Sequence, residues 1–451
     1  MIVFNLNLKN KSNVMGKLFK TKMLAIGLAV FQSLLGEARF PSESGFAFKS
    51  QGLAHLYQAQ SSELFWDQVE FEGGTPLVES IPADEEHVLL TFLFKQSNES
   101  VKGVALVGEL AEFLLPNHSL AVIPHTDVWY KTVRVRKDLR TTYAFSVNDQ
   151  NLTPAQAYAL PIEKRVELLE SYLIDPFNQQ EPLNGFSVIG LSNAAKWILK
   201  TDVPKGKLIE INFKSCLLSN ERKVEIYLPY SYRSDEEYPL IVFLDGDAYT
   251  KVIAAPAILD HLIAADKIPE SVALFVSSIN NEIRNKELSC NALFDQFLVE
   301  ELLPWVRGRF SVKDDPSQTV VVGASLGGLG ATCVAFRENA TFGKVLAQSG
   351  SFWWGPGELT EGNKWEWLTT QFTEHDKISL ELYLEAGLLD VVSIGDEPSI
   401  LESNRHLRDV LMAKGYDVKY VEFNGGHHQI NWRESLADGL VQLLPKNPSK
   451  D

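Results

Sequence analysis

The chain of 451 residues contains 45% hydrophobic and 22% charged residues, which is enough apolar sequence for one large or two ordinary globular domains. This composition excludes a disordered chain, a collagen-like chain and a disulfide-stapled miniprotein. The formal net charge of −16 argues against a generic nucleic-acid binder, because neutralising phosphates requires clustered Lys and Arg.

The first 38 residues have the order of a secretory signal peptide. Three lysines between residues 17 and 22 precede an apolar run over 23–30, and Gly36 and Ala38 follow. A basic region, a short apolar run and small residues before a cleavage site define such peptides. We expect residues 1–38 to be removed and the mature protein to be periplasmic or secreted, with no stable membrane insertion. The alternative is a frayed helix, with the start at Met1, Met15 or Met23 left open.

Residues 39–190 are rich in strand-forming sequence. Short runs of β-formers separated by turn-forming residues predict several strands with little helix between them. The expected strands cover 87–94, 101–107, 129–135 and 141–147, and one helix is expected at 161–170. This pattern favours an N-terminal β-sandwich of immunoglobulin-like type. A strip rich in Pro, Asn and Gly at 175–185 then suggests a connection between domains.

Residues 201–451 alternate strands with helices. The expected strands cover 224–229, 239–245, 272–278, 319–323, 343–348, 380–384 and 418–423, and helices are expected at 294–310, 400–414 and 432–444. Alternation of this kind predicts a mostly parallel sheet covered by helices on both faces, in an α/β protein. Its functional groups should lie in loops at the carboxyl ends of the strands.

The sequence Gly323-Ala-Ser325-Leu-Gly327 is a G-x-S-x-G motif between an apolar strand and a helix-forming run. In that context the glycines permit a sharp turn that lifts the serine hydroxyl above the sheet. We predict that Ser325 is a catalytic nucleophile and that the N–H of Leu326 faces the developing oxyanion. A P-loop is excluded because no Lys follows the glycines. The alternative is an ordinary glycine-rich connection.

A serine nucleophile requires a general base and an orienting carboxylate. In α/β-hydrolases these follow in the order serine, acid, histidine. We favour His427, in a glycine-rich loop after the last expected strand, over its neighbour His428; His375 and His406 lie in less suitable segments. Asp390 is the favoured acid, since it lies in the loop beyond a strand, and Glu385 and Asp396 are the alternatives. A second oxyanion donor should be the backbone N–H of Gly246 or Asp247.

The sequence predicts no resident metal or organic cofactor. Cys216, Cys290 and Cys333 are widely spaced, form no zinc-binding pattern and no disulfide framework, and are expected to be small buried hydrophobic residues.

The segments that carry these residues resemble the enterochelin (enterobactin) esterases, which hydrolyse ferric siderophores with an esterase-D-like α/β-hydrolase domain. The resemblance rests on segments 243–246, 284–291, 300–304, 323–328, 348–354, 384–387, 425–427 and 432–433, with 126–130 and 175–178 in the N-terminal half. It covers nearly all of the chain beyond about residue 85.

The resemblance implies a serine esterase that cleaves a cyclic trilactone of catecholyl-serine, with or without iron. It assigns Ser325, His427 and Asp390 to catalysis, and iron would enter only as part of the substrate. The residues that would line the substrate loop are Arg284, Glu287, Asn291, Trp353, Trp354 and Arg433, with Lys251 as a further cation. Most full-length relatives are cytoplasmic, and His428 stands where relatives have Asp, so compartment and substrate remain open at this point.

Two other functions compete with this interpretation. A general carboxylesterase, acyltransferase or peptidase could use the same scaffold. A catalytically inert siderophore- or glycan-binding protein could share the fold, although the set of Ser325, His427 and Asp390 argues against it.

Overall fold

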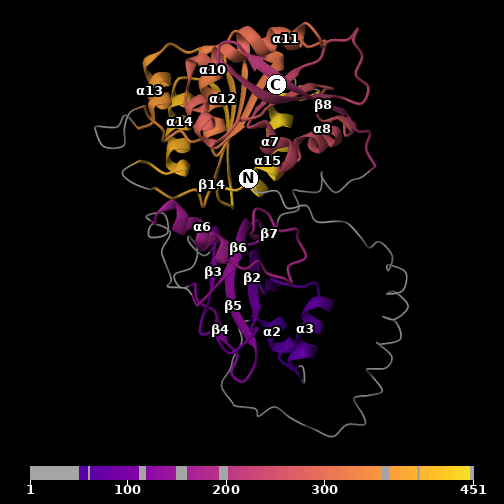
Figure 1. Ribbon diagram of the computed structural model, residues 1–451, viewed down its shortest axis with the longest axis vertical. Coiled ribbons are helices and arrows are strands. Elements are labelled where there is room, and N and C mark those ends of the chain that lie inside the picture. Colours follow the sequence, from indigo (N-terminus) through magenta and orange to yellow (C-terminus); the bar gives the residue numbers. More distant parts are fainter. Residues whose placement is uncertain are drawn as a thin grey trace.

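The structure is a computed structural model that describes residues 50–58, 61–110, 118–148, 160–191, 202–356, 365–393 and 397–446. The expected signal peptide and the alternative acid Asp396 lie outside the described residues. The described chain forms two bodies stacked along its long axis: a lower one of antiparallel sheets and an upper one built around a large sheet (Figure 1).

Two antiparallel sheets form the N-terminal body. One has the order β1 (Leu77–Ile81), β2 (Asp84–Lys95), β5 (Val128–Arg136) and β4 (Ala121–Val122), and the other has the order β3 (Val104–Val107), β6 (Arg140–Val147) and β7 (Ser187–Gly190). Side chains from both sheets meet in one core that includes Phe92, Tyr143 and Phe145, all fully buried. The antiparallel β architecture expected for this half is confirmed.

The helices of this half were only partly expected. Helix α6 (Ile162–Ser171) lies where the pattern predicts one, whereas α2 (Gln51–Leu56) and α3 (Ser62–Phe71) were not foreseen. The side chains of Ser50 and Ser61 cap these two helices. Leu53, Trp66 and Val69 pack against the outer side of β2 and β5, which gives the short helices a buried face.

The C-terminal body contains one eight-stranded sheet. Its order is β15 (Asp417–Phe423), β14 (Glu381–Gly387), β13 (Lys344–Gln348), β12 (Thr319–Ala324), β10 (Leu240–Leu244), β11 (Val272–Val276), β9 (Asn220–Leu228) and β8 (Lys207–Ser215). Only β9 runs against its neighbours. Counted within this domain the order is 1-2-4-3-5-6-7-8, which is that of an α/β-hydrolase.

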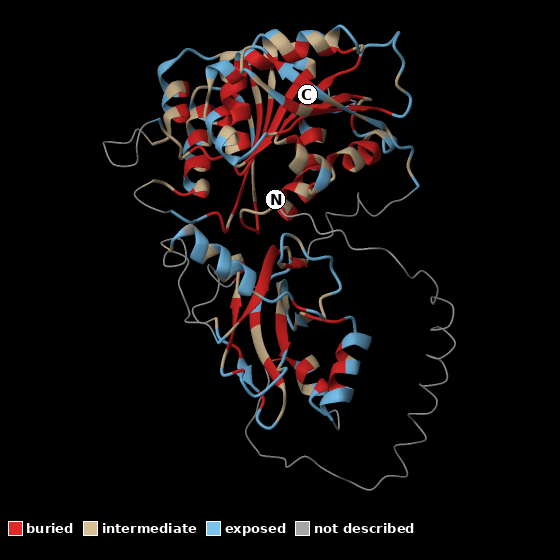
Figure 2. Ribbon diagram, in the orientation of Figure 1, coloured by how far each residue is buried: buried red, intermediate tan, exposed pale blue. Residues whose placement is uncertain are grey.

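The central strands are buried on both faces, as Figure 2 shows. Along β10, Leu240, Val242 and Leu244 enter one core, and Ile241 and Phe243 enter the other, because successive strand side chains point to opposite faces. The first core is covered by α10 (Ala292–Gln296), α11 (Leu303–Arg307), α12 (Leu326–Arg337), α13 (Trp367–Glu374) and α14 (Ile400–Ala413). The second is covered by α7 (Gly246–Lys251), α8 (Ala255–Ala264) and α15 (Gln429–Leu443).

The helix expected at 294–310 is interrupted. A π-helical segment, Phe297–Leu302, separates α10 from α11. Pro304 occupies the first turn of α11, and its missing N–H removes a donor from the regular ladder.

The expectation for the cysteines is wrong on two points. Cys290, which follows α9 (Asn281–Leu288), forms a disulfide with Cys333 on α12, and Cys216 is exposed. The pairing is non-local and joins residues 43 apart, so spacing alone did not indicate it. Among the described residues, no helix has both the length and the hydropathy needed to cross a bilayer.

Candidate active site

Ser325 lies on a tight turn between β12 and α12. Its backbone angles are φ 58° and ψ −125°, a sparsely populated region that costs about 1–3 kcal/mol and persists only where surrounding contacts impose it. Those contacts come from β13 and the loop after it: the Ser325 N–H donates to the Gln348 carbonyl at 2.9 Å, and the Ser325 carbonyl accepts from the Ser351 N–H at 3.0 Å. A Cβ atom at Gly323 would lie 2.1 Å from the Gly327 carbonyl oxygen, so the turn requires glycine there.

His427 lies directly against the serine. Its Nε2 is 2.8 Å from Ser325 Oγ, within the range for proton transfer between a nucleophile and its base. The loop that carries it runs from the end of β15 to the start of α15, and the Trp432 ring meets the imidazole edge-on with centroids 5.1 Å apart. Ser351 Oγ, 3.5 Å from Ser325 Oγ, is a second nearby hydroxyl.

His428 does not compete for this position. It occupies the N-cap position of α15 without a capping hydrogen bond from its side chain, and its N–H donates to the Gly426 carbonyl at 2.9 Å. Burial, together with the positive charges of His427 and Arg433, lowers the pKa of His428 to about 4. A histidine with that pKa is neutral at physiological pH.

Asp390 is the carboxylate that faces the base. Its Oδ1 lies 3.3 Å from His427 Nδ1, and its side chain is fully buried. The other oxygen, Oδ2, accepts from the Gly387 N–H at 3.0 Å. In the free protein the Asp390–His427 contact does not reach the geometry of an aligned hydrogen bond, and catalytic hydrogen bonds of this kind often tighten only when substrate is bound. Burial is the largest single influence and lowers the pKa of His427, but Asp390 and, less strongly, Glu109 together outweigh burial, so the pKa of His427 is raised.

Glu385, the alternative acid, points into the interior. Its carboxylate accepts from Gln348 Nε2 at 2.9 Å and from the hydroxyl of Ser435. Burial raises its pKa to about 7, against which the hydrogen bonds from Ser435 and Gln348 act. The geometry therefore favours Asp390 over Glu385.

The two expected oxyanion donors lie at helix N-termini. Leu326 begins α12 and Gly246 begins α7, and the first N–H groups of a helix have no partner within it. Asp245, just before α7, has left-handed backbone angles, φ 55° and ψ 47°. Its carboxylate accepts from Ser278 Oγ at 2.7 Å and from Arg284 Nη2 at 2.7 Å.

Asp245 is a residue that the sequence reasoning missed as a functional side chain. A Cβ atom at Gly327 would lie 3.0 Å from Asp245 Oδ2, so this carboxylate lies close to the first turn of α12. It therefore lies between the two segments that carry the expected oxyanion donors. In the sequence, Asp245 could have been noticed because it directly precedes Gly246, in the loop after a buried strand.

The residues assigned to the substrate loop divide into two groups. Arg284 forms a bidentate ion pair with Asp245 and Asn291 caps α10 through the Leu293 N–H at 2.9 Å. Glu287 is buried, and its oxygens accept from Arg222 at 2.5 and 2.9 Å. A buried carboxylate with both oxygens engaged does not face substrate, so the prediction for Glu287 does not fit the structure.

The remaining candidates are partly buried, as Arg284 and Asn291 are. Trp353 and Trp354 are half-buried and lie beside Trp365 and Trp367, with ring centroids 6.1 and 6.2 Å apart. Arg433 on α15 donates to the Val252 carbonyl at the end of α7.

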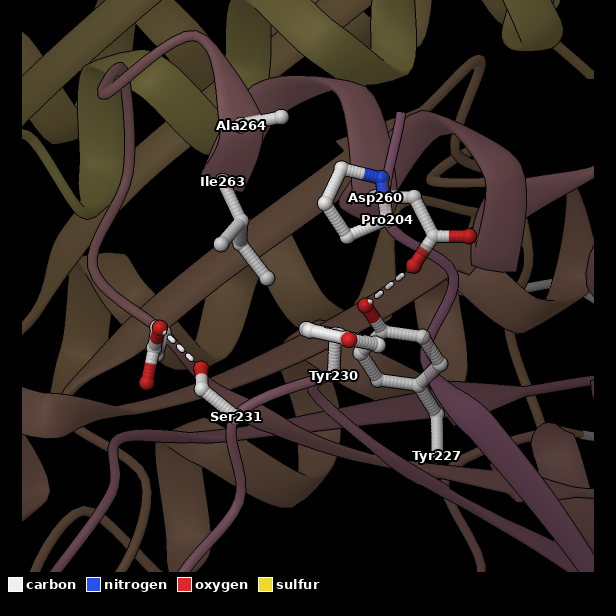
Figure 3. Close-up of a pocket in the computed structure, with 8 residues that line it drawn as sticks. Pro204, Tyr227, Tyr230, Ser231, Asp260, Ile263 and Ala264 are labelled. Atoms are coloured by element: carbon white, nitrogen blue, oxygen red, sulfur yellow. Dashed lines mark hydrogen bonds between the residues drawn. The ribbon is translucent and has the colours of Figure 1, made fainter. Parts of the chain in front are cut away.

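A cavity of about 160 Å³ lies elsewhere on this domain, lined by residues of β9 and α8 (Figure 3). Asp260 there accepts from Tyr227 Oη at 2.7 Å and from the Gly206 N–H at 2.8 Å. Tyr227 pairs with Ala273 near the amino end of β11. The cavity therefore lies at the amino ends of the parallel strands, whereas Ser325 lies at their carboxyl ends. Among the described residues, no group of three or more His, Cys, Asp or Glu side chains could hold a metal ion.

The fold, with a strained serine after the fifth strand of the domain and a histidine after the last, defines a hydrolase of the α/β-hydrolase class. Residues 215–443 match the family described as "Putative esterase", and residues 89–197 match the family described as "Enterochelin esterase, N-terminal". The chain therefore belongs to the enterochelin esterase family and is a carboxylic ester hydrolase.

Individual relatives agree over both domains. The iron(III) enterobactin esterase of Escherichia coli O6:H1 is 31% identical, with 72% of this chain and 81% of the relative covered. The iron(III) enterobactin esterase of Dickeya dadantii is 29% identical, with 88% and 97% covered. The crystal structure of the enterobactin esterase from Shigella flexneri in the presence of enterobactin superposes with a TM-score of 0.69 at 27% identity, covering 85% of this chain and 98% of that one.

Proposed function

We propose that this protein is a serine esterase that hydrolyses the ester bonds of a catecholate siderophore, an enterobactin-like trilactone in its ferric or iron-free form. The observation that carries the proposal is the 2.8 Å separation between Ser325 Oγ and His427 Nε2, on a turn that holds the serine backbone in a strained conformation. The names of the relatives, which are iron(III) enterobactin esterases, support the substrate class.

In the first half of the reaction, Ser325 Oγ attacks an ester carbonyl carbon. His427 accepts the hydroxyl proton, a C–O bond forms, and the carbonyl oxygen becomes an oxyanion held by the N–H groups of Leu326 and Gly246. Asp390 stabilises the imidazolium and holds its tautomer. The imidazolium then gives its proton to the departing alkoxide as the original ester bond breaks.

In the second half, water replaces the alcohol. His427 removes a proton from the water, the new C–O bond forms at the acyl carbon, and Ser325 leaves with a proton returned by the imidazolium. A trilactone contains three such ester bonds, so the same cycle can open the ring and then shorten the chain. Side chains and backbone groups of the protein carry every step of this cycle, and any iron enters only as part of the substrate.

The substrate's charge and aromatic rings need matching groups near the serine. A ferric tris-catecholate is strongly anionic, so it requires local cations on an acidic protein. Arg433 donates a hydrogen bond to the Val252 carbonyl at the end of α7. The exposed Lys251 directly precedes Val252 in the chain. Trp353 and Trp354, both half-buried, would contact catechol rings.

The test compares three substrates with one purified protein. Mass spectrometry should detect the linear trimer, dimer and monomer from enterobactin, with kcat/KM well above that for a p-nitrophenyl ester, and no cleavage of a peptide. Ser325→Ala should abolish both ester activities while retaining the fold. A substrate preference for the simple ester would favour a general carboxylesterase, and full activity of the Ser325→Ala protein would contradict the proposed chemistry.

We further propose that the protein acts outside the cytoplasm. The signal-like order of residues 1–38 and the disulfide between Cys290 and Cys333 support this location, because disulfides persist in oxidising compartments. Cell fractionation with N-terminal sequencing should find the native protein beginning at Arg39 in the exported fraction. A cytoplasmic protein with reduced cysteines would contradict this location.

A further inference from the structure

The N-terminal body contacts the loop that carries His427. Arg140, the first residue of β6, forms a parallel bridge with Gly425, and its N–H donates to the Asn424 carbonyl at 2.9 Å. Asn424 Nδ2 in turn donates to Asp138 Oδ1 at 2.9 Å. These bonds fix the backbone of the loop just before His427. β15 is an edge strand of the large sheet. The bridge between Arg140 and Gly425 joins the segment after this strand to β6 of the N-terminal body.

The side chain of Arg140 holds both ends of the same loop. Its Nη1 donates to Glu434 Oε2 on α15 at 3.2 Å, with the two side chains only 10% and 4% exposed. Its guanidinium also lies over the ring of Phe423, the last residue of β15, with 5.1 Å to the ring centroid. One side chain of the N-terminal body therefore touches the element before His427 and the element after it.

The glycines of the loop leave room for this contact. A Cβ atom at Gly425 would lie 2.5 Å from the Arg140 carbonyl oxygen. A Cβ atom at Gly426 would lie 2.5 Å from the carboxyl carbon of Glu109, a second residue of the N-terminal body. The charge of Glu109 adds to that of Asp390 in raising the pKa of His427, while burial and Arg284 act against it.

The acid loop meets the same surface. The Leu389 N–H donates to the Gly425 carbonyl at 2.9 Å, and the Leu389 side chain is buried in the core of the N-terminal sheets. The next residue is Asp390. The loops that carry the histidine and the acid are therefore both attached to the N-terminal body, whereas Ser325 depends on contacts within the C-terminal domain.

We propose that Arg140 is a positioning residue of the reaction, through which the N-terminal domain sets the position of His427 relative to Ser325 and Asp390. This inference rests on the proposed esterase chemistry. Its consequence is that the N-terminal domain contributes to turnover even for an ester too small to touch it.

The test uses the full chain and p-nitrophenyl acetate. Arg140→Ala should lower kcat about 10- to 100-fold, because a misplacement of about 1 Å of a catalytic group has effects of that order, while KM changes little. Arg140→Lys should recover only part of the loss, since lysine keeps the charge but lacks the planar fork. Arg134→Ala is the matched control: Arg134 is an exposed arginine of β5 that pairs with Asp84, and its loss should leave kcat unchanged.

A pH profile separates positioning from mere stability. The titratable and charged groups that act on His427 are Asp390, Glu109 and Arg284, and the neighbouring His428 interacts with it electrostatically. If Arg140→Ala lets the imidazole move from the carboxylates, the acid limb of kcat/KM should shift to lower pH. Glu434→Gln should produce the same shift, and the double variant should add little to either single change. Circular dichroism and the melting temperature are measured in parallel.

The outcomes are distinct. The inference would be overturned if the variants Arg140→Ala, Arg140→Lys or Glu434→Gln had a lower melting temperature but an unchanged kcat and pH profile. The ion pair would then have a purely structural role. If the wild-type protein and Ser325→Ala are equally inactive on every ester, the proposed function itself fails. If Arg140→Ala does not fold, Arg140→Lys and Glu434→Gln give the same readouts.

Discussion

The serine side and the histidine side of the candidate site are held in different ways. Ser325 lies on a turn whose contacts come from the neighbouring strand and helix of the same domain. His427 lies on a loop that the other domain holds through Arg140. The nucleophile turn is therefore encoded locally, in a few residues of sequence, while the geometry of the base depends on packing between residues far apart in the chain.

The largest effect should follow from removing the base. His427→Ala should lower kcat by at least about 10⁴-fold, because loss of a triad member leaves only oxyanion stabilisation and binding. Its matched control is His428→Ala, at the adjacent position, where the pKa of about 4 keeps the ring neutral. Steady-state hydrolysis of p-nitrophenyl acetate measures both. Comparable losses in the two variants would contradict the assignment of His427.

Asp390→Asn should be the next most damaging change on the histidine side, with a loss of about 10³- to 10⁴-fold in kcat, since an amide favours the wrong tautomer of the imidazole. The base must be neutral to act, and Asp390 raises the pKa of His427. In the wild type, kcat/KM should therefore decline as pH falls through a value above the ordinary histidine pKa of about 6.5. The residual activity of Asp390→Asn should decline at a lower pH. An unchanged midpoint would show that Asp390 does not act on the base.

A smaller effect is expected on the serine side from Asp245→Asn. The variant weakens the bidentate pair with Arg284 and loosens the segment that begins with Gly246. We expect kcat to fall about 10- to 100-fold, less than the loss of a whole oxyanion donor, which costs about 10²–10³. KM for a small ester should hardly change. Asp235→Asn, an exposed carboxylate paired with Arg233, is the control and should have wild-type kinetics.

The smallest effect on activity should come from the disulfide. Cys290 and Cys333 tie the segment after α9 to the nucleophile helix α12. Replacing both by serine should lower the free energy of unfolding by about 2–4 kcal/mol, as for other disulfides that close long loops, while kcat at low temperature stays within about 2-fold of wild type. Urea denaturation with activity measured in parallel tests this. Cys216→Ser should alter neither quantity.

The features that could be predicted from the sequence are those with local signals. The apolar strand, the glycines and the helix-forming run around Ser325 gave the turn, and the order of elements placed Asp390 and His427 at the carboxyl ends of β14 and β15. The central strands were visible because both faces are buried, which makes their sequences uniformly apolar.

The features that were missed depend on partners distant in sequence. Glu287 was assigned to substrate by resemblance, but its partner Arg222 lies 65 residues away. The Arg140–Glu434 pair spans 294 residues, and no local pattern marks either member. Helices α2 and α3 were overlooked because they are short, and short helices gain most of their stability from the face they bury and not from propensity.

Covalent labelling with a fluorophosphonate, mapped by mass spectrometry, would show whether His427 activates the hydroxyl of Ser325. We predict that the reagent phosphonylates Ser325, that His427→Ala abolishes the labelling, and that His428→Ala reacts at the wild-type rate. Labelling of Ser351, whose hydroxyl is 3.5 Å from that of Ser325, or undiminished labelling of Ser325 in the His427→Ala protein, would contradict this prediction.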